Sequence, residues 1–278
     1  MFSTGRVKAD RPVTFSENAE AVNYDKLVFH NYNLKGPVIM ENDEHTGRVR
    51  GFLTWEHPPS ITGGNLNKTY FLRQVNFRWA NEHSFNGVDY PAKLHLVHIS
   101  DQYSPGKKES VPGNIAVVAV PVLAGDEELE IEELKPLYEE KDVISPYSGS
   151  RDVALFNPRV LLPWDTTTYY RYNGSLTTPP CAEDGVIWTV MQKPIVLSVE
   201  QLNALKNAHL NREPKIVHKI RISQPMEGRK LYLNRKVKSH FFMEQRGENE
   251  KKFSTDMQFI FVILFILLVI PCALLCFG

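Results

Sequence analysis

The sequence lacks an excess of charge of either sign, because 32 lysine and arginine residues balance 32 aspartate and glutamate residues over 278 positions. Proteins that bind nucleic acid usually carry a clear basic excess or stripe, so we predict no nucleic-acid partner. Cysteine is also scarce, since Cys272 and Cys276 lie in the apolar C-terminal tail and Cys181 is the only other one. A single cysteine cannot form an internal disulfide, which excludes a domain held together by a disulfide framework.

The N-terminal residues contain no apolar run of the length that a secretory signal peptide requires. The C-terminus, by contrast, contains a long apolar run, because no charged residue occurs between Phe259 and Phe277. As a helix this stretch would span about 28 Å at ~1.5 Å per residue, close to the ~30 Å hydrocarbon core of a bilayer. We therefore predict a single-pass membrane protein whose helix covers residues 257–278. A glycolipid-anchor signal is the alternative interpretation of this tail, with Gly247 as the small residue before a polar spacer.

The side of the membrane on which the rest of the chain lies depends on the N-terminus. The sequence as it stands predicts a cytosolic domain, whereas a missing signal peptide would make the domain extracellular. Two N-glycosylation triplets, Asn67-Lys-Thr and Asn173-Gly-Ser, would matter only in a lumenal or extracellular domain.

Short apolar runs rich in β-branched residues predict strands at residues 94–99, 115–122 and 187–191. Residues 198–208 predict a short helix, and the acidic stretch 127–141 has some helical spacing. The pattern indicates the α+β fold class, with one domain around a large, mainly antiparallel β-sheet. The predicted boundaries are 1–10 for an N-terminal leader, 11–237 for the domain, 238–256 for a polar juxtamembrane linker and 257–278 for the transmembrane helix.

Three blocks of the sequence point to one family. They are Gly63–Trp79 (GGNLNKTYFLRQVNFRW) with Glu82-His83 after it, Lys93–His98 (KLHLVH), and Tyr172–Cys181 (YNGSLTTPPC) followed by Trp188 and Gln224-Pro. Their order and spacing resemble the α-class carbonic anhydrases over most of the chain, residues 11–237. The resemblance implies a single domain with a conical cleft that leads to a zinc ion. Three histidines hold that zinc, two from a His-x-His pair on one strand and one from the neighbouring strand. Residues i and i+2 of a strand point to the same side, and three imidazoles leave one position for a water whose pKa falls to ~7.

The residues at those positions depart from the family. The His-x-His pair falls on Asn76 and Arg78, the third ligand falls on His95, and the carboxylate that orients this histidine falls on Lys93. Asparagine is a poor zinc ligand, and arginine has five donors and no acceptor. Arg78 and Lys93 would also place positive charge near a divalent cation. We therefore expect neither zinc nor another cofactor.

Other family positions keep their residues. Thr177 matches the threonine that orients the zinc-bound hydroxide, Glu82 the acid that accepts its hydrogen bond, and His45 lies near the proton-shuttle histidine. We interpret all three as vestigial, with Glu82 and Thr177 holding loop and sheet together. The family's N-terminal segment is absent, together with the cysteine that in secreted relatives pairs with the one matching Cys181.

Two functions remain open. The first is a catalytically inactive carbonic-anhydrase-related protein that acts as a membrane-anchored binding module for an anionic ligand or a protein partner. A basic cleft formed by Arg78, Lys93, Lys219 and Arg221 would favour an anion. The alternative is a zinc-dependent carbonate dehydratase with a metal site rebuilt from His95 and His45, because His98 follows His95 by three residues and faces the other side of a strand.

Overall fold

The computed structural model describes residues 14–15, 19–42, 47–79, 84–85, 90–102, 113–126, 130–138, 149–176, 185–210 and 230–235. All of them belong to one compact unit, Met1–Arg235. The predicted linker 238–256 and transmembrane helix 257–278 lie outside the described residues. Within the described part of the chain, no helix has both the length and the apolar character needed to cross a membrane.

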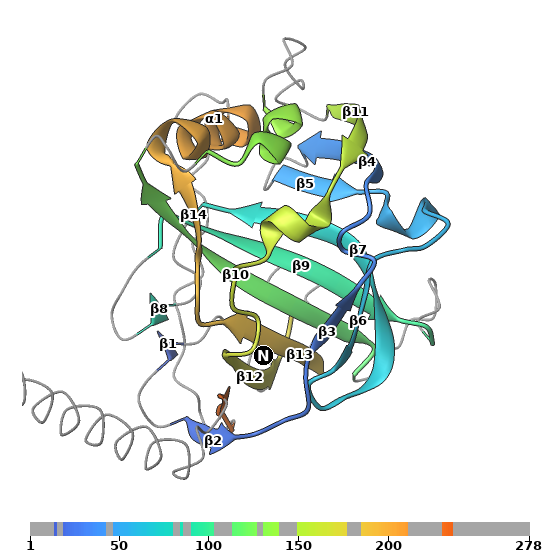
Figure 1. The fold of residues 1–278 in the computed structure, drawn as a ribbon, viewed down its shortest axis with the longest axis vertical. Coiled ribbons are helices and arrows are strands. Elements are labelled where there is room, and N and C mark those ends of the chain that lie inside the picture. Colours follow the sequence, from blue (N-terminus) through green and yellow to red (C-terminus); the bar gives the residue numbers. More distant parts are fainter. Residues whose placement is uncertain are drawn as a thin grey trace, which may run out of the picture. The chain divides into compact units, whose positions relative to one another are not determined.

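A large central β-sheet organises the described residues (Figure 1). Its strands are β2 (Glu20–Val22), β3 (Val28–His30), β4 (Gly36–Asn42), β5 (Gly47–Arg50), β6 (Ser60–Gly63), β7 (Leu66–Arg78), β9 (Ala92–Ser100), β10 (Ile115–Gly125), β11 (Ser150–Phe156), β12 (Tyr169–Gly174), β13 (Val186–Met191), β14 (Ile195–Ser198) and β15 (Tyr232–Asn234). The main path runs β11-β4-β5-β7-β9-β10-β13-β12-β15-β2, with β14 beside β10 and β6 between β3 and β7. A separate parallel pair consists of β1 (Thr14–Phe15) and β8 (Ser84–Phe85).

The sheet is mixed. Most neighbouring strands run antiparallel, as predicted, but β10 runs parallel to β13 and to β14, and β15 runs parallel to β2. Strands buried on both faces have continuous apolar runs rather than alternating ones. This is why the predicted strands at residues 94–99, 115–122 and 187–191 are confirmed as β9, β10 and β13, which cross the middle of the domain (Figure 1).

The helical elements are short. They are η1 (Phe52–Thr54), η3 (Glu132–Leu137), η4 (Pro158–Leu161) and α1 (Val199–Leu210). The predicted helix at residues 198–208 is confirmed as α1, and its first turn is capped by Ser198, whose Oγ accepts a hydrogen bond of 3.0 Å from the Gln201 N–H. Within the acidic stretch 127–141, the described residues 130–138 contain the 3₁₀ helix η3.

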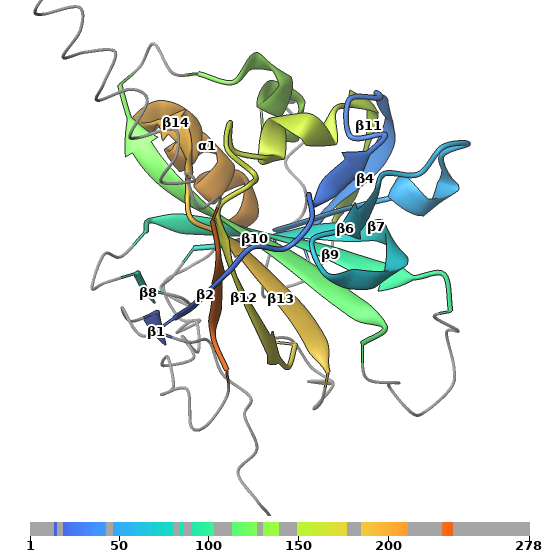
Figure 2. The same cartoon turned by 60° about the horizontal axis from the view of Figure 1, so that its bottom comes forward.

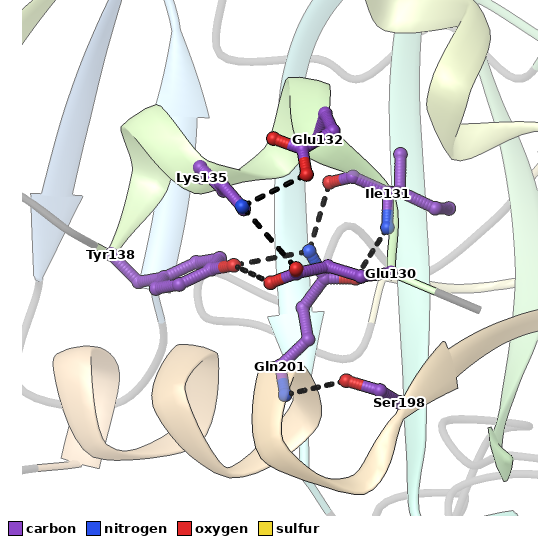
Figure 3. Close-up of polar contacts among 7 residues, drawn as sticks. All are labelled: Glu130, Ile131, Glu132, Lys135, Tyr138, Ser198 and Gln201. Atoms are coloured by element: carbon purple, nitrogen blue, oxygen red, sulfur yellow. Dashed lines mark hydrogen bonds and ion pairs between the residues drawn. The ribbon is translucent and has the colours of Figure 1, made fainter. Parts of the chain in front are cut away.

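Gln201 attaches α1 to the segment that leads into η3 (Figure 3). Its side chain is 1% exposed and pairs with the backbone of Ile131, because Oε1 accepts from the Ile131 N–H at 3.0 Å and Nε2 donates to the Ile131 carbonyl at 2.8 Å. Nε2 also lies 3.2 Å from the Tyr138 hydroxyl, which donates to Glu130 Oε1 at 2.9 Å. The buried amide thus provides hydrogen-bond partners for the N–H and carbonyl of Ile131, which lies outside the strands.

The two faces of the sheet contribute to different apolar clusters. The larger cluster contains Leu94 and Leu96 of β9 with Leu202 and Leu205 of α1. The smaller cluster contains Val97 of β9 together with side chains of β10, β12 and β13. We call the sides of the sheet the helix face and the His95 face, because His95 alternates with Leu94 and Leu96.

His98 is buried on the helix face, where its Nε2 lies 2.6 Å from the hydroxyl of Tyr32. Both side chains are almost fully shielded from solvent. Burial lowers the pKa of His98 from 6.5 to about 3 and raises the pKa of Tyr32 well above 10. The hydrogen bond therefore joins two neutral groups at physiological pH.

A tight turn joins β6 to β7. Gly63, Gly64 and Asn65 all have positive φ, at 71°, 58° and 61°. A Cβ on Gly63 would lie 2.1 Å from the backbone oxygen of Lys26, so this position excludes a side chain for two reasons. The turn is also tied down by Asp25, whose Oδ1 accepts from the Asn65 N–H at 2.8 Å.

We expect Gly63→Ala to lower the free energy of unfolding by more than about 2 kcal/mol, because it combines positive φ with a backbone clash. Gly113→Ala is the matched control: its φ is 77° but nothing lies within 4 Å of the added Cβ. The control should lose only about 1 kcal/mol. Denaturant unfolding of both variants checks the difference, and equal losses would contradict the contact with Lys26.

Protonation of His98 should make the fold less stable in acid. In the unfolded chain its pKa returns to about 6.5, so the unfolded state binds a proton that the folded state excludes. This contribution is complete above pH 6.5 and is lost as pH falls toward 3, with a slope of up to about 1.4 kcal/mol per pH unit. His98→Gln should flatten the pH dependence by one proton. Identical slopes in wild type and His98→Gln would refute this origin.

Candidate functional site

The antiparallel pairing of β7 with β9 brings the family's zinc positions together. Asn76 lies opposite His95, and Arg78 lies opposite Lys93. Directly paired residues project to the same side of a sheet, and residues two apart on one strand do so as well. All four side chains therefore emerge from the His95 face as a square of adjacent positions.

Three of the four residues of the square are buried, and Arg78 is half-buried. Asn76 is 3% exposed, Lys93 1% and His95 2%. Gln74, two residues before Asn76, donates from Nε2 to Asn76 Oδ1 at 3.0 Å. The asparagine amide is thus held in place by a neighbour on its own strand.

An apolar wall adjoins His95. Its ring makes a T-shaped contact with Trp188 of β13, with ring centroids 5.0 Å apart and an interplanar angle of 80°. Trp188 in turn stacks on Tyr172 at 6.0 Å and donates from its indole nitrogen to the Ser175 carbonyl at 3.1 Å. Val97, Val117 and Val186 belong to the same apolar cluster.

Two further cations lie on this face, although no motif in the sequence pointed to them. Arg48 of β5 pairs with Asn76, and Arg50 pairs with Gln74. Both lie near Glu41, at 4.0 Å for Arg48 and 2.6 Å for Arg50. The alternation in Gly47-Arg-Val-Arg50 was the available signal, but only the register between β5 and β7 shows which face it serves. We call Arg48, Arg50, Arg78 and Lys93 the basic patch, and Glu41 lies beside two of its four cations.

The remaining predicted residues fall into two groups. His45, Glu82, Thr177, Lys219 and Arg221 lie outside the described residues. His98, as expected from its spacing, is on the helix face with Tyr32. Among the described residues, the predicted site thus reduces to Asn76, Arg78, Lys93 and His95.

Comparisons with known proteins agree with the sequence motifs. The family model for eukaryotic-type carbonic anhydrase matches residues 7–235. "Putative carbonic anhydrase 5" of Caenorhabditis elegans is 34% identical over 213 residues, which cover 74% of this chain and 68% of that protein. "Putative carbonic anhydrase 3" of the same organism is 31% identical over 82% of this chain and 90% of its own length. Human carbonic anhydrase 7 is 35% identical over 61% of this chain and 67% of its own. Because the family model matches most of the chain, this chain belongs to the eukaryotic-type, α-class carbonic anhydrase family.

Proposed function

We propose that this chain is a catalytically inactive member of the carbonic anhydrase family that acts as a membrane-anchored binding module for an anionic ligand. The observation that carries the proposal is the square of Asn76, Arg78, Lys93 and His95 on one buried face of the sheet. Its members occupy the family's metal-binding positions with side chains of the wrong chemistry for a metal.

The donor set does not fit a zinc ion. A catalytic zinc site needs three protein ligands with free lone pairs, and the square offers one imidazole, from His95. Arg78 has no acceptor and stays charged. Lys93 stands where a carboxylate would orient the imidazole, and losing such a partner typically lowers metal affinity about 10–100-fold.

Electrostatic repulsion also disfavours a zinc ion beside His95. Two unit charges ~4 Å apart interact with about 4 kcal/mol at an effective dielectric constant of ~20. Arg78 and Lys93 are direct cross-strand neighbours, so both would repel a dication beside His95. Without the metal there is no water of low pKa, and hydration of carbon dioxide has no nucleophile.

The same charges favour an anion. Like charges directly opposite each other on neighbouring strands are destabilising, and an anion near Arg78 and Lys93 would relieve their repulsion. Arg48 adds further positive potential beside Asn76. The buried position of the pair strengthens the attraction, because the effective dielectric constant is lower there than in water.

Membrane attachment rests on the sequence alone, through the charge-free stretch within residues 257–278. A chain held at a membrane by one short anchor presents its domain to ligands in the adjacent solution. This arrangement suits a binding module and does not depend on which side of the membrane the domain faces.

The alternative is a carbonate dehydratase with a rebuilt metal site. Its support is His95, which retains a ligand position. Of the two further histidines considered, His98 is engaged on the helix face with Tyr32, so only His45 remains as a recruit. The alternative therefore has two histidines where the family uses three.

The full-length chain, purified in detergent, should contain less than about a tenth of an equivalent of zinc and should not hydrate carbon dioxide above the buffer rate. The combined variant Asn76→His, Arg78→His and Lys93→Glu restores the donors and the orienting carboxylate, so it should bind about one zinc per chain. Metal analysis and stopped-flow hydration measure both. Arg73→His, exposed on the same strand, is the control for adventitious binding, and stoichiometric zinc with turnover in the wild type would establish the alternative.

The basic patch should account for anion binding on this face. Arg78→Gln combined with Lys93→Met removes both charges at similar side-chain size and should weaken phosphate binding there at least about tenfold. Lys35→Gln removes an exposed charge outside the patch and should have no effect. Calorimetric titration with phosphate measures each, and an unchanged affinity in the double variant would sink the anion-binding role.

A further inference from the structure

A second buried cation lies on the helix face, on the side of the sheet away from His95. Tyr170 and Tyr172 of β12 pack into the His95-face cluster, so Arg171 between them points to the opposite face. Its direct neighbours are Thr189 on β13 and Tyr232 on β15. These strands and β2 lie together at one end of the sheet (Figure 2).

Arg171 is 6% exposed, yet its guanidinium is poorly satisfied. Its Nε and Nη2 are buried without a hydrogen-bond acceptor, and the hydroxyls of Tyr169 and Thr189 are likewise buried without a partner. The guanidinium lies 5.4 Å from the centre of the Tyr169 ring, and no ion pair joins it to a carboxylate in the described part of the chain. Buried polar groups in this state are unfavourable unless something else satisfies them.

The groups that face Arg171 do not neutralise it. Three of them are the phenols of Tyr24, Tyr70 and Tyr169, whose pKa values burial raises, to about 12 for Tyr169. They are therefore uncharged at physiological pH. The one carboxylate among the facing groups is Asp25, which is exposed and accepts a hydrogen bond from the Asn65 N–H. The guanidinium keeps its charge, because arginine does not deprotonate in proteins.

A cavity of about 610 Å³ opens beside Arg171. The charged side chains among its described lining residues are Arg171 and Lys230, both positive. Neutral donors come from Asn65, and aromatic walls from Tyr24 and Tyr232, whose rings meet edge to face at 6.4 Å. We propose that this cavity binds an organic oxyanion, a phosphate or sulfate ester, with Arg171 and Lys230 on the charged group and the tyrosine rings against the organic body.

The volume of the cavity favours an organic ester over a free inorganic ion. Small-molecule sites typically occupy about 300–1,000 Å³, and this cavity falls within that range, whereas an inorganic phosphate would fill only a small part. Tyrosine rings offer apolar surface to a sugar or aromatic group. The oxyanion supplies acceptors for Nε and Nη2, which a charge-assisted, bidentate contact satisfies together.

The two asparagines of the glycosylation triplets, Asn67 and Asn173, are both exposed and line this cavity. A glycan on either would lie at its entrance. The test therefore uses chain produced in bacteria, which leaves these asparagines unmodified.

The test is calorimetric titration of the full-length chain in uncharged detergent with inorganic phosphate and with phenyl phosphate. All variants are built on the background Arg78→Gln with Lys93→Met, so that heat from binding at these two cations of the basic patch does not contribute. On this background we expect phenyl phosphate to bind about tenfold more tightly than inorganic phosphate, because the rings contact the phenyl group. Equal affinities for the two probes would overturn the ester and leave an inorganic anion site.

Arg171→Met should weaken phenyl phosphate binding at least about 30-fold, and Lys230→Gln, at an exposed position, should weaken it several-fold without affecting folding. Lys193→Gln, also exposed, is the control and should bind like its background. Arg171→Met should also unfold at a higher temperature than its background in anion-free buffer, because it removes an unsatisfied buried charge.

This test separates the cavity from the anion-binding role proposed for the basic patch. If phenyl phosphate binds the wild type but not the background variant, the heat belongs to the basic patch and the cavity proposal is wrong. If Arg171→Met and Lys230→Gln both bind like the background, the proposal is also wrong. Loss of binding in these two variants alone supports it, whatever the role of the basic patch.

Discussion

Because β7 and β9 pair with Asn76 opposite His95 and Arg78 opposite Lys93, these four positions form a single unit. In a sheet, direct opposition places Cβ atoms about 5 Å apart, so each of these side chains alters the surroundings of the other three. The same register extends to β5, where it adds Arg48 beside Asn76. The basic patch is therefore a property of three adjoining strands.

Buried positive charge recurs on both faces of this sheet. Lys93 and Arg171 are 1% and 6% exposed, and charged side chains are seldom so deeply buried unless they are paired. For Arg171, whose Nε and Nη2 lack an acceptor, an anionic ligand is one way to meet the desolvation cost that burial imposes. The faces differ in their surroundings, since the basic patch adjoins an aliphatic and tryptophan wall whereas Arg171 adjoins tyrosines and a cavity. Two separate ligands of different shape are consistent with this difference.

The comparison with relatives concerns the fold rather than the chemistry of the site. The family match extends over residues 7–235, and the apolar strands, the turn at Gly63 and the aromatic stack at Trp188 all lie within it. The packing of these elements does not require a particular side chain at Asn76, Arg78 or Lys93 for catalysis. Fold membership alone therefore does not assign an activity.

The sequence by itself determined the family, the central strands and the helix near residue 200, because apolar runs, capping residues and motif spacing are local signals. The family resemblance also pointed to Asn76, Arg78, Lys93 and His95, and the two-residue spacing within each strand predicted that each pair lies on one side of the sheet. Only the tertiary structure decided the parallel pairings of β10, β13 and β14, the membership of Arg48 and Arg50 in the basic patch, and the burial of Arg171 beside a cavity. The physical reason is that register and pairing between strands distant in the sequence are set by packing across the whole sheet, which no local pattern encodes.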